Sequence, residues 1–597
     1  MFLGYQLAAL PLLLRVGMRV GLAAFRAHVR LRRLTGFCRL DLPRRIAAVE
    51  SWASGPIAPC RQLFRALRSL ALLAYHEASA EPGAVASTPA GAVQRSPKHS
   101  WAGVVAVVRR HEERVGVLVV GSGAGGAVTA LELASQGHDV LLVEEGPPPG
   151  EPVPDAGSTR TMAGLYRCRG MTPILGRVPI AYVEGCCVGG STEINSGFWH
   201  RPPTETLLRW KAQYDLDCAS PEELSPHSEW AEHAIGVRLQ GGLWPPSSEV
   251  FDRGARAMDW VVSEVPRSAA EARGTSAAGI AAQGAPGPGM SRSVIPRALS
   301  AGTRLLAGCR VERLETSGSR VIAALVRRGH DDGTTEQVRI RAEHVFVCAG
   351  PTETPALLRR SGVVRNVGDS LRIHPMLKLA ARFREEMDSG PDTMPVLQVK
   401  EFQPDIVLGG SFFSPGHLAV VLADNWAVTH DRMKTVRHMA CYYVGVRGTG
   451  RGRVRPSRLE SGRTDIRYQL SDQDMWSLSR GVARLAVMLL EGGAIEVLPA
   501  VRGLPAIRNE VEAVRWLDDR LDGRNCSLTT VHAFSSCPMG ERLDRCAADS
   551  FGRLHDFDNL YINDASMLPD SPGVNPQGTI MTFARRNALR FCDEHPA

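Results

Sequence analysis

A glycine-rich turn between two apolar runs is the feature that most constrains what this chain can fold into. The first run is Val117–Val120, the turn is Gly121-Ser122-Gly123-Ala124-Gly125-Gly126, and an Ala/Leu-rich stretch leads to a second run, Val140–Val143. This order predicts a strand, a helix and a second strand within about 30 residues. Glycines at the first, third and sixth positions allow a tight turn, close approach of the backbone to a pyrophosphate, and close packing of helix on strand. We therefore predict a Rossmann-like domain with the phosphates at a helix N-terminus.

An acidic residue at the end of the second run limits which dinucleotides the site can bind. Glu144 lies 23 positions after Gly121, close to the spacing of about 20 at which a carboxylate accepts a hydrogen bond from a ribose hydroxyl. A carboxylate at this place would repel the 2′-phosphate of NADP. The alternative is a glycine turn that holds no ligand, which the flanking runs and the acid together disfavour. The pattern alone leaves both NAD and FAD open.

The N-terminal 80 residues are expected to be helical. An apolar stripe at helical spacing supports this, and its members are Leu63, Phe64, Leu67, Leu70 and Ala74. The apolar segment Met1–Leu14 is interrupted by Gln6 and Pro11, and it is shorter than the roughly 20 residues that a membrane-spanning helix needs. Arg15 and Arg19 follow this segment, whereas a signal peptide carries its positive charge in front. We expect these helices to pack on the rest of the protein, with peripheral membrane contact through residues 1–80 as the alternative.

Composition excludes some classes of partner. The formal net charge of +8 is spread over 597 residues, so we expect no nucleic-acid partner. The 13 cysteines show no metal-ligand spacing, and Cys186 and Cys187 are adjacent, so we predict no metal site. Mostly free thiols are typical of a reducing compartment, and we expect a cytoplasmic protein, with a peripheral position at a membrane as the alternative.

A second sheet is expected after residue 375. Apolar or alternating runs predict its strands, and they are Leu377–Phe383, Leu418–Leu422, Tyr442–Val446 and Asp465–Leu470. Ser471, with Asp474 three residues on, predicts the start of a long helix. Val345–Cys348 predicts a further buried strand, whereas residues 265–290 are rich in Gly, Ala, Ser and Pro and predict an irregular loop.

Four stretches resemble the signature segments of the glucose–methanol–choline (GMC) oxidoreductases, and they occur in the order typical of that family. They are Gly185-Cys-Cys-Val-Gly189-Gly190-Ser191-Thr-Glu-Ile-Asn195, the segment from Gly350 to Val363, the segment from Val367 to Pro375, and the C-terminal block from His532 to Ala588. Within the family, the long-chain alcohol oxidase branch is the most similar, because of the added N-terminal helices and the sequence Ser-Thr-Glu-Ile-Asn at residues 191–195. Val364 stands where the family usually has glycine, and Ser535-Ser536 where many members have Gly-Thr.

The resemblance implies an α/β fold: a Rossmann-like FAD-binding domain that is discontinuous in sequence, and a substrate domain with a mainly antiparallel sheet. A helical N-terminal extension, residues 1–80, and a linker, residues 81–112, precede them. Residues 113–375 and 526–597 are then expected to form the FAD-binding domain, and residues 376–525 the substrate domain, part of which is inserted around residues 200–295.

The resemblance also implies a chemistry. An alcohol loses its hydroxyl proton to a base and a hydride to flavin N5, and a base that works near neutral pH points to histidine. The position of the family's catalytic base is His532, and its partner position is Asn575. His374, in the third segment, is interpreted as structural, as part of a His-Pro pair that shapes the start of a strand.

Further residues are expected to contact FAD. Asp564 could accept from ribityl hydroxyls, with a plain helix cap as the alternative, and the helix that begins at Asn575 and Pro576 would stabilise a reduced, anionic flavin. The residues expected to bind FAD are Gly121, Ser122, Gly123, Ala124, Gly125, Gly126, Glu144, Gly189, Gly190, Ser191, Asn195, Val311, Asp564, Ala565, Pro576 and Thr579. The sequence identifies no attachment site, so we expect non-covalent FAD.

The implied activity is oxidation of a CH–OH group to an aldehyde or ketone, with a long-chain or otherwise apolar alcohol as the expected substrate. The electron acceptor is oxygen or a carrier such as a quinone. Alternatives are a tailoring oxidation of a secondary metabolite or sterol, a lyase that keeps FAD as a structural part, and an inactive flavin-binding protein. The presence of both His532 and Asn575 argues against the last.

Overall fold

The computed structural model describes residues 2–53, 55–79, 112–148, 162, 164–239, 241, 244–268, 289–329, 334–387 and 395–597. The expected linker, residues 81–112, lies outside the described residues except for Glu112, which begins the first strand. Most of the expected irregular loop, from residue 269 to residue 288, also lies outside them.

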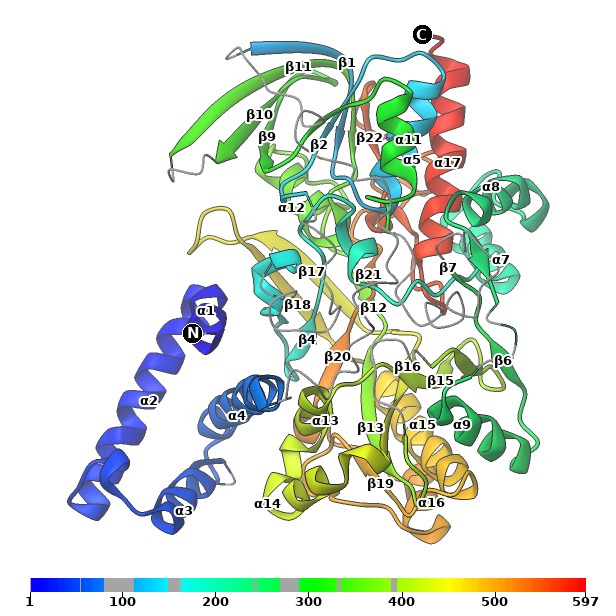
Figure 1. Cartoon of the computed structure of the whole chain (residues 1–597). Helices are drawn as coiled ribbons and strands as arrows, with labels where there is room; N and C mark the ends of the chain where they lie inside the picture. The colour runs from blue at the N-terminus through cyan, green and yellow to red at the C-terminus, as the bar shows by residue number, and fades with distance from the viewer. Residues whose placement is uncertain are drawn as a thin grey trace, which may run out of the picture.

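Seven of the described strands form a largely parallel sheet at one end of the molecule (Figure 1). Their order is β8-β2-β1-β11, and β11 then pairs with both β10 and β22. The strands are β1 (Glu112–Val120), β2 (Val140–Val143), β8 (Arg304–Leu306), β9 (Cys309–Ser317), β10 (Arg320–Gly329), β11 (Thr335–Val347) and β22 (Leu560–Ile562). The expected strand–helix–strand unit is confirmed, because α5 (Ala124–Ser135) joins β1 to β2 and the two strands pair in parallel.

Helices cover this sheet and connect it to the rest of the chain. The helix α5 packs against α11 and against the C-terminal helix α17, which run side by side in Figure 1. The helix α8 packs against α17, so residues from within the expected insertion lie on this end of the molecule. These helices are α7 (Thr204–Tyr214), α8 (Pro221–Ala234), α11 (Val294–Ser300), α12 (Gly350–Arg360) and α17 (Gln577–Glu594).

Nine of the described strands form a second, mainly antiparallel sheet. Their order is β3-β4-β20-β13-β16-β15-β14-β6, with β19 paired to β13. The strands are β3 (Thr172–Ile174), β4 (Ile180–Tyr182), β6 (Val262–Glu264), β13 (Met376–Arg382), β14 (Leu397–Val399), β15 (Ile406–Ser411), β16 (Met439–Val446), β19 (Glu496–Pro499) and β20 (Leu528–Thr530). This sheet also includes segments outside residues 200–295 and 376–525, because β3 and β4 precede residue 200 and β20 follows residue 525.

One face of the second sheet is covered by helices. The long helix α15 (Asp472–Glu491) packs on β15 and β16, with α9 (Pro246–Ala257) and α16 (Glu510–Asp518) against it. It begins as expected, because the Ser471 hydroxyl accepts from the Asp474 N–H and the Asp474 carboxylate accepts in return from the Ser471 N–H. The side chain of Val444 on β16 lies against Gly481 of α15, so alternate residues of β16 face away from this helix.

Two expectations about the second sheet are wrong. The run Asp465–Leu470 does form a strand, β18 (Thr464–Gln469), but this strand pairs with β17 (Arg451–Pro456) in a separate two-stranded sheet. The run Leu418–Leu422 belongs to a helix, α13 (Pro415–Leu422). Ser414 caps it by accepting from the His417 N–H, and Pro415 occupies the first turn. A short apolar run does not by itself distinguish a buried strand from a buried helix, and the cap is the signal that decides this case.

Shorter elements join the two sheets. The strands β12 (Arg372–Ile373) and β21 (Ala533–Phe534) pair with each other, as do β17 (Arg451–Pro456) with β18 (Thr464–Gln469) and β5 (Val237–Arg238) with β7 (Arg267–Ser268). The β12–β21 pair aligns the chain just before β13 with the chain just after β20. This pairing brings His374 and His532 together.

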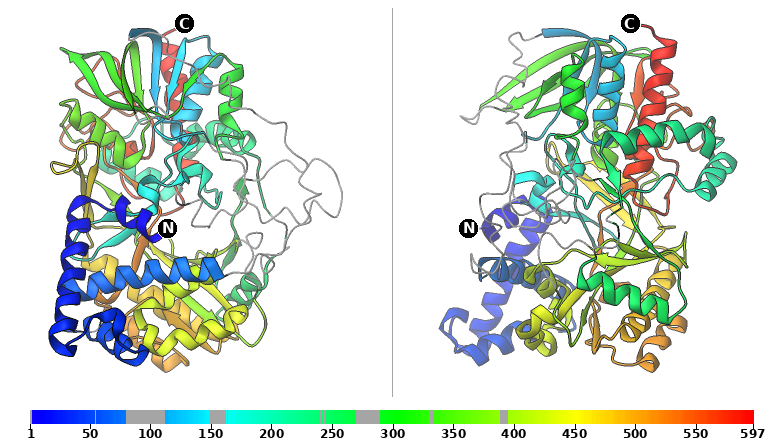
Figure 2. Two further views of the ribbon diagram at one scale, coloured as in Figure 1. Left: turned by 60° about the vertical axis from the view of Figure 1, so that its left-hand side comes forward. Right: turned by 45° about the vertical axis from the view of Figure 1, so that its right-hand side comes forward.

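The N-terminal helices lie beside the second sheet, as both views of Figure 2 show. They are α1 (Phe2–Ala9), α2 (Leu12–Arg33), α3 (Leu42–Ala53) and α4 (Ala58–Ser79), which confirms the expected helical extension. Phe25, Phe64 and Trp52 form a small aromatic core, with ring centroids 4.9 Å apart for Phe25 and Phe64. The helix α4 packs on α13, where the Arg65 guanidinium binds the buried Asp424 carboxylate. Among the described helices, none combines the length and apolarity needed to cross a bilayer.

Candidate functional site

A cavity of about 450 Å³ runs between the two sheets. At one end it is lined by the turn from β1 to α5 and by the end of β2, and at the other by residues of β13, β15 and β16. His532 and Asn575 lie on its wall, together with the first residues of α17. The predicted cofactor residues and the predicted catalytic pair therefore share one cavity.

The glycine turn has the geometry that its sequence predicts. Gly121 has a φ of +99°, and a Cβ at Gly126 would collide with the Gly121 carbonyl oxygen. At Gly123, by contrast, a Cβ would meet none of the described atoms within 4 Å. The open side of the turn thus faces the cavity at the start of α5, where free N–H groups and the helix dipole favour a phosphate.

Glu144 holds the turn in place from the end of β2. One carboxylate oxygen accepts from the Ser122 N–H at 3.0 Å and from the Ser122 hydroxyl at 2.8 Å, and the other accepts from the Gly146 N–H at 2.9 Å. The Ser122 hydroxyl in turn accepts from the Gly189 N–H at 2.9 Å. Burial raises the pKa of Glu144, while these hydrogen bonds oppose that effect. Glu144 also lines the cavity, where a ribose hydroxyl would meet it.

Most of the expected FAD-binding residues line this cavity. Those that do are Gly121, Ser122, Gly123, Ala124, Gly125, Glu144, Gly190, Ser191, Asn195, Val311, Asp564, Ala565 and Pro576. Gly126, Gly189 and Thr579 do not line it: Gly126 packs on the turn, Gly189 adopts a φ of +97°, and Thr579 is fully buried in α17. These three residues would therefore affect the binding of a cofactor only indirectly, by positioning the residues that line the cavity.

Asp564 links three segments at the floor of the cavity. Its carboxylate accepts from the Gly350 N–H at 2.8 Å, from the Ser566 N–H at 2.7 Å and from the Thr354 hydroxyl. It therefore caps the short 3₁₀ helix Ala565–Met567, which is the alternative role given above, and it still lines the cavity. Together with the open glycine turn, these groups fit a dinucleotide laid from Glu144 towards Asn575.

A cluster of charges beside Glu144 was missed by the sequence analysis. Glu145 binds Arg167 at 2.9 Å and also Arg310, which binds Glu353 at 2.9 Å. Burial alone would raise the pKa of Glu145, but the two guanidinium groups lower it to about 2. Arg167, Arg310 and Glu353 line the cavity. Their chain positions carry no local motif, because the pairs form only when the sheet brings residues 145, 167, 310 and 353 together.

The predicted catalytic pair, His532 and Asn575, lies at the other end of the cavity. The Asn575 side-chain nitrogen is 3.3 Å from His532 Nε2, so the amide donates and the ring nitrogen accepts. The loop that carries Asn575 is anchored by α7, since the Thr206 hydroxyl donates to the Pro572 carbonyl at 3.0 Å and Arg209 donates to the Ser571 carbonyl at 2.8 Å.

His374 was interpreted as structural, but it contacts the predicted base, His532, directly. Its Nδ1 lies 3.1 Å from His532 Nδ1, and its Nε2 lies 2.8 Å from the Ser571 hydroxyl. His374 lies between β12 and β13, and the pairing of β12 with β21 brings it to His532. The His-Pro pair does mark the start of β13, and the missed signal was its place within a family segment.

Burial sets the protonation of this pair. Burial lowers the pKa of His532 to about 4, and burial, together with the proximity of His532, also lowers the pKa of His374. Both rings are therefore neutral near pH 7, and the lone pair of His532 Nε2 accepts from the Asn575 amide. In the part of the chain that the structure describes, no group of His, Cys, Asp or Glu could hold a metal ion.

Comparisons with known proteins agree with this geometry. The family models described as GMC oxidoreductase match residues 115–376 and 448–584. An uncharacterized GMC-type oxidoreductase of Sinorhizobium fredii is 35% identical over 473 residues, which is 79% of this chain and 93% of that protein. A long-chain-alcohol oxidase of Arabidopsis thaliana is 25% identical over 506 residues, which is 78% of this chain and 66% of that protein.

Solved structures share the fold. The structure of pyridoxine 4-oxidase from Mesorbium loti aligns with a TM-score of 0.61 at 18% identity, covering 81% of this chain and all of that one. A variant of Aspergillus oryzae formate oxidase aligns with a TM-score of 0.62 at 16% identity, covering 81% of this chain and 99% of that one. The two sheets, the cavity between them and the matched segments together show that the chain belongs to the GMC oxidoreductases, a family of FAD-binding enzymes.

Proposed function

We propose that this protein oxidises the CH–OH group of an alcohol to an aldehyde or ketone with FAD as its cofactor. The observation that carries the proposal is the neutral, half-buried His532 beside Asn575, on the wall of the cavity whose other end fits a dinucleotide. An alcohol placed against Nε2 can give its hydroxyl proton to the ring. When bound, FAD supplies the acceptor for the hydride that leaves the same carbon.

The protein's own groups prepare this step. Asn575 donates to the place where the substrate oxygen would lie, without adding a second titrating group. His374 holds the ring of His532 from the opposite nitrogen, and Ser571 holds His374. The start of α17, at Gln577, lines the cavity, and the positive end of the helix dipole favours negative charge there.

We further propose that FAD is bound without a covalent bond and that oxygen is the electron acceptor, with a quinone or another carrier as the alternative. The Arabidopsis thaliana relative and the pyridoxine 4-oxidase described above are both named as oxidases, which supports oxygen. The substrate we propose is an alcohol with a largely apolar chain, supported by the likeness to long-chain-alcohol oxidases. A sterol or secondary-metabolite alcohol is the alternative within the same chemistry.

The test is reduction of the bound flavin by alcohols without oxygen. We expect the oxidised-flavin absorption of the purified protein to bleach with primary alcohols and to return when air is admitted. If the absorption bleaches but does not return in air, a carrier rather than oxygen would be favoured as the electron acceptor. A flavin that no alcohol bleaches would contradict the proposal and favour a lyase, and a protein that cannot be reconstituted with FAD would contradict the cofactor as well.

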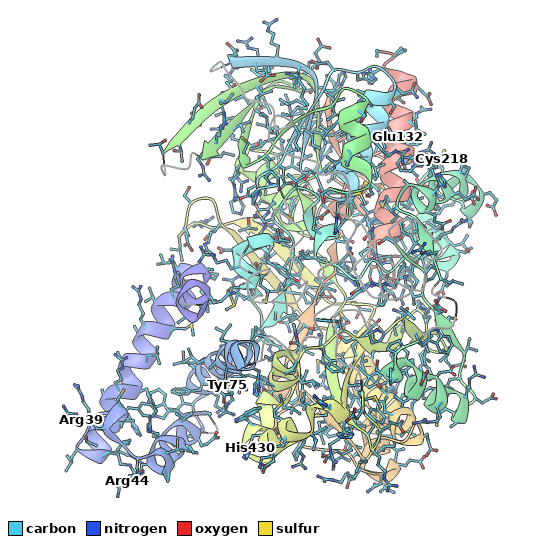
Figure 3. All side chains as sticks on the ribbon, viewed as in Figure 1. Arg39, Arg44, Tyr75, Glu132, Cys218 and His430 are labelled. Atoms are coloured by element: carbon cyan, nitrogen blue, oxygen red, sulfur yellow. The ribbon has the colours of Figure 1, made fainter. Side chains whose placement is uncertain are left out.

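We also propose that α1–α4 rest against an anionic membrane surface. Residues 1–80 contain twelve Arg and three acidic residues, so they account for the positive charge of the whole chain. Exposed apolar side chains lie among these cations, with Leu13 65% and Leu31 81% exposed. Figure 3 shows Arg39 and Arg44 at the outer end of these helices, away from the two sheets. Apolar side chains between cations are typical of helices that lie in a lipid interface.

Co-sedimentation with vesicles tests this contact. We expect binding to vesicles that contain phosphatidylglycerol, weakening in high salt, and little binding to phosphatidylcholine alone. Leu13→Gln should weaken binding, whereas Val511→Gln, at a 79% exposed site on α16, is the matched control. Equal binding to both kinds of vesicle, or equal binding by both variants, would contradict the proposal.

A further inference from the structure

The face of the second sheet that looks into the cavity carries rows of side chains set by strand register. Lys378 on β13 pairs with Tyr443 on β16, Tyr443 pairs with Gly409 on β15, and Gly409 pairs with Gln398 on β14. Residues directly opposite each other in antiparallel strands point to the same face. Lys378, Tyr443 and Gln398 accordingly all line the cavity.

Because Gly409 has no side chain, the Tyr443 ring can lie across it and reach Gln398 on the next strand. A Cβ at Gly409 would lie 2.8 Å from the Tyr443 ring, so the phenol ring lies over the glycine. There the Tyr443 hydroxyl accepts from the Gln398 amide nitrogen at 2.7 Å. Burial raises the pKa of Tyr443 to about 12, so the phenol keeps its proton. That proton is directed by the Gln398 contact and can be donated to a ligand.

Lys378 brings a positive charge to the same row without a matching negative charge. No carboxylate among the described residues lies within 4.0 Å of its ammonium, and the wall contributed by described residues of β13 to β16 contains no Asp or Glu. Arg447, the other cation on this wall, binds Asp405 at 2.8 Å. The nearby His417 is neutral, because burial lowers its pKa to about 4.

A less polar row separates Lys378 from the catalytic pair. Met376 pairs with Gly445, and Gly445 pairs with Val407, and all three line the cavity. His374, Met376 and Lys378 follow at two-residue steps along one line of the chain, so the backbone of Lys378 lies about 13 Å beyond that of His374. The Lys378 side chain can shorten this span by reaching back.

From this arrangement we infer that the substrate is an alcohol that carries an anionic oxygen group, separated from its hydroxyl by an apolar spacer. The inference rests on the proposed function and specifies its substrate class. Lys378 forms an ion pair with the anion, the Tyr443 hydroxyl donates to it, and the row of Met376 and Val407 packs on the spacer. A half-buried, unpaired ammonium beside a buried donor is costly until an anion occupies it.

The experiment compares matched pairs of probes by anaerobic flavin reduction. Each pair is an ω-hydroxycarboxylic acid and the 1-alkanol of the same carbon number, from four to twelve carbons; ω-hydroxyalkyl phosphates and ω-aminoalcohols extend the series. We compare the concentrations of acid and of alkanol that give half-maximal flavin reduction. At the best chain length, we expect this concentration to be at least about tenfold lower for the acid, because one charge-assisted hydrogen bond provides a gain of that size. The aminoalcohol should be poorer than the alkanol. A phosphate that exceeds the carboxylate would identify a phosphomonoester as the anionic group.

Variants assign the effect to Lys378. Lys378→Met should remove the preference for the acid over the alkanol of the same length, whereas Lys378→Arg should keep most of it. Lys211→Met, on the exposed surface of α7, removes the same charge away from the cavity and should have no effect. Tyr443→Phe should weaken acid binding by a smaller factor.

The possible results separate this inference from the proposed function. Equal reduction by acid and alkanol would overturn the inference and leave alcohol oxidation intact. If no alcohol bleaches the flavin, the proposed function fails, and the anion site is then tested by calorimetric titration of the holoenzyme with unreactive alkanoates. Binding at least about tenfold tighter to the wild type than to Lys378→Met supports the site; equal binding overturns it.

Discussion

The Nδ1 atoms of His374 and His532 lie 3.1 Å apart, so one ring must donate a proton to the other. Asn575 donates to Nε2 of His532, which therefore carries its own proton on Nδ1 and donates it to His374. His374 then donates from Nε2 to the Ser571 hydroxyl. This order of donors leaves Nε2 of His532 unprotonated, which is the tautomer that a base requires. A substrate hydroxyl would take the place of the Asn575 amide at that nitrogen.

Removing the base should separate binding from chemistry. We expect His532→Ala to keep FAD and to slow flavin reduction by the best alcohol at least about a hundredfold. His430→Ala, at an exposed histidine, is the matched control and should reduce at the normal rate. Near-normal reduction in His532→Ala, measured by stopped-flow absorption, would remove the assignment of the base.

The contact between the two histidines should act on rate through positioning. His374→Leu removes the acceptor for the His532 proton, and we expect flavin reduction to slow by about tenfold, the effect of one neutral hydrogen bond. His374→Asn can present an oxygen near the place of Nδ1 and should recover part of the rate. The acid limb of the pH profile should also move in His374→Leu, because the second ring no longer favours one tautomer. Unchanged rate and profile in both variants would mean that His374 only shapes the chain.

The rate of flavin reduction should depend on pH on the acid side. Because burial lowers the pKa of His532 to about 4, the ring is neutral, and the base is present, throughout the neutral range. We expect the rate to be constant above that pKa and to fall as the pH falls through about 4. An acid limb centred near the usual pKa of histidine, about 6.5, would contradict the desolvated, neutral state of this ring.

Cofactor retention should depend on Glu144. Glu144→Ala leaves the Ser122 and Gly146 N–H groups without their acceptor and removes the carboxylate that faces the cavity. We expect the dissociation constant for FAD to rise by about ten- to a hundredfold, measured by reconstituting apoprotein and following flavin fluorescence. Glu144→Gln should lose less. Glu343→Ala, remote from the cavity lining, is the control, and equal affinity in all three would argue against the ribose role.

The N-terminal helices should loosen when their main ion pair is cut. Arg65→Ala leaves Asp424, which is 2% exposed, without its guanidinium partner. We expect a loss of about 2–3 kcal/mol, below the 3–5 kcal/mol for a fully buried pair, because Arg65 is partly exposed. Hydrogen exchange should rise in α4 and leave α5 unchanged. The double variant Arg65→Ala with Asp424→Asn should recover part of the loss, since no buried charge then remains unpaired.

Local chemistry explains which parts of the fold were predictable. The unit from Val117 to Val143 was predicted closely because each glycine meets a need within a few residues of itself. His532 and Asn575 were predicted only through resemblance, since nothing around a single histidine distinguishes a base from a structural ring. The role of His374 was missed because it depends on the pairing of β12 with β21, which joins positions 158 residues apart. The row of Lys378, Tyr443 and Gln398 likewise depends on the register of four strands.

The placement of His532 between β20 and β21 has a consequence for how such enzymes diversify. His532 and His374 lie on connections where the chain passes between the two sheets, and Asn575 lies on the loop that leads into α17. The proposed substrate contacts, by contrast, lie on the strands of one sheet face. A change at Lys378, Tyr443 or Met376 alters a wall without shifting the reacting groups, because the strand backbone stays in register. Lineages that share this architecture can therefore exchange one substrate for another through a few point substitutions while the proton-accepting machinery is inherited unaltered.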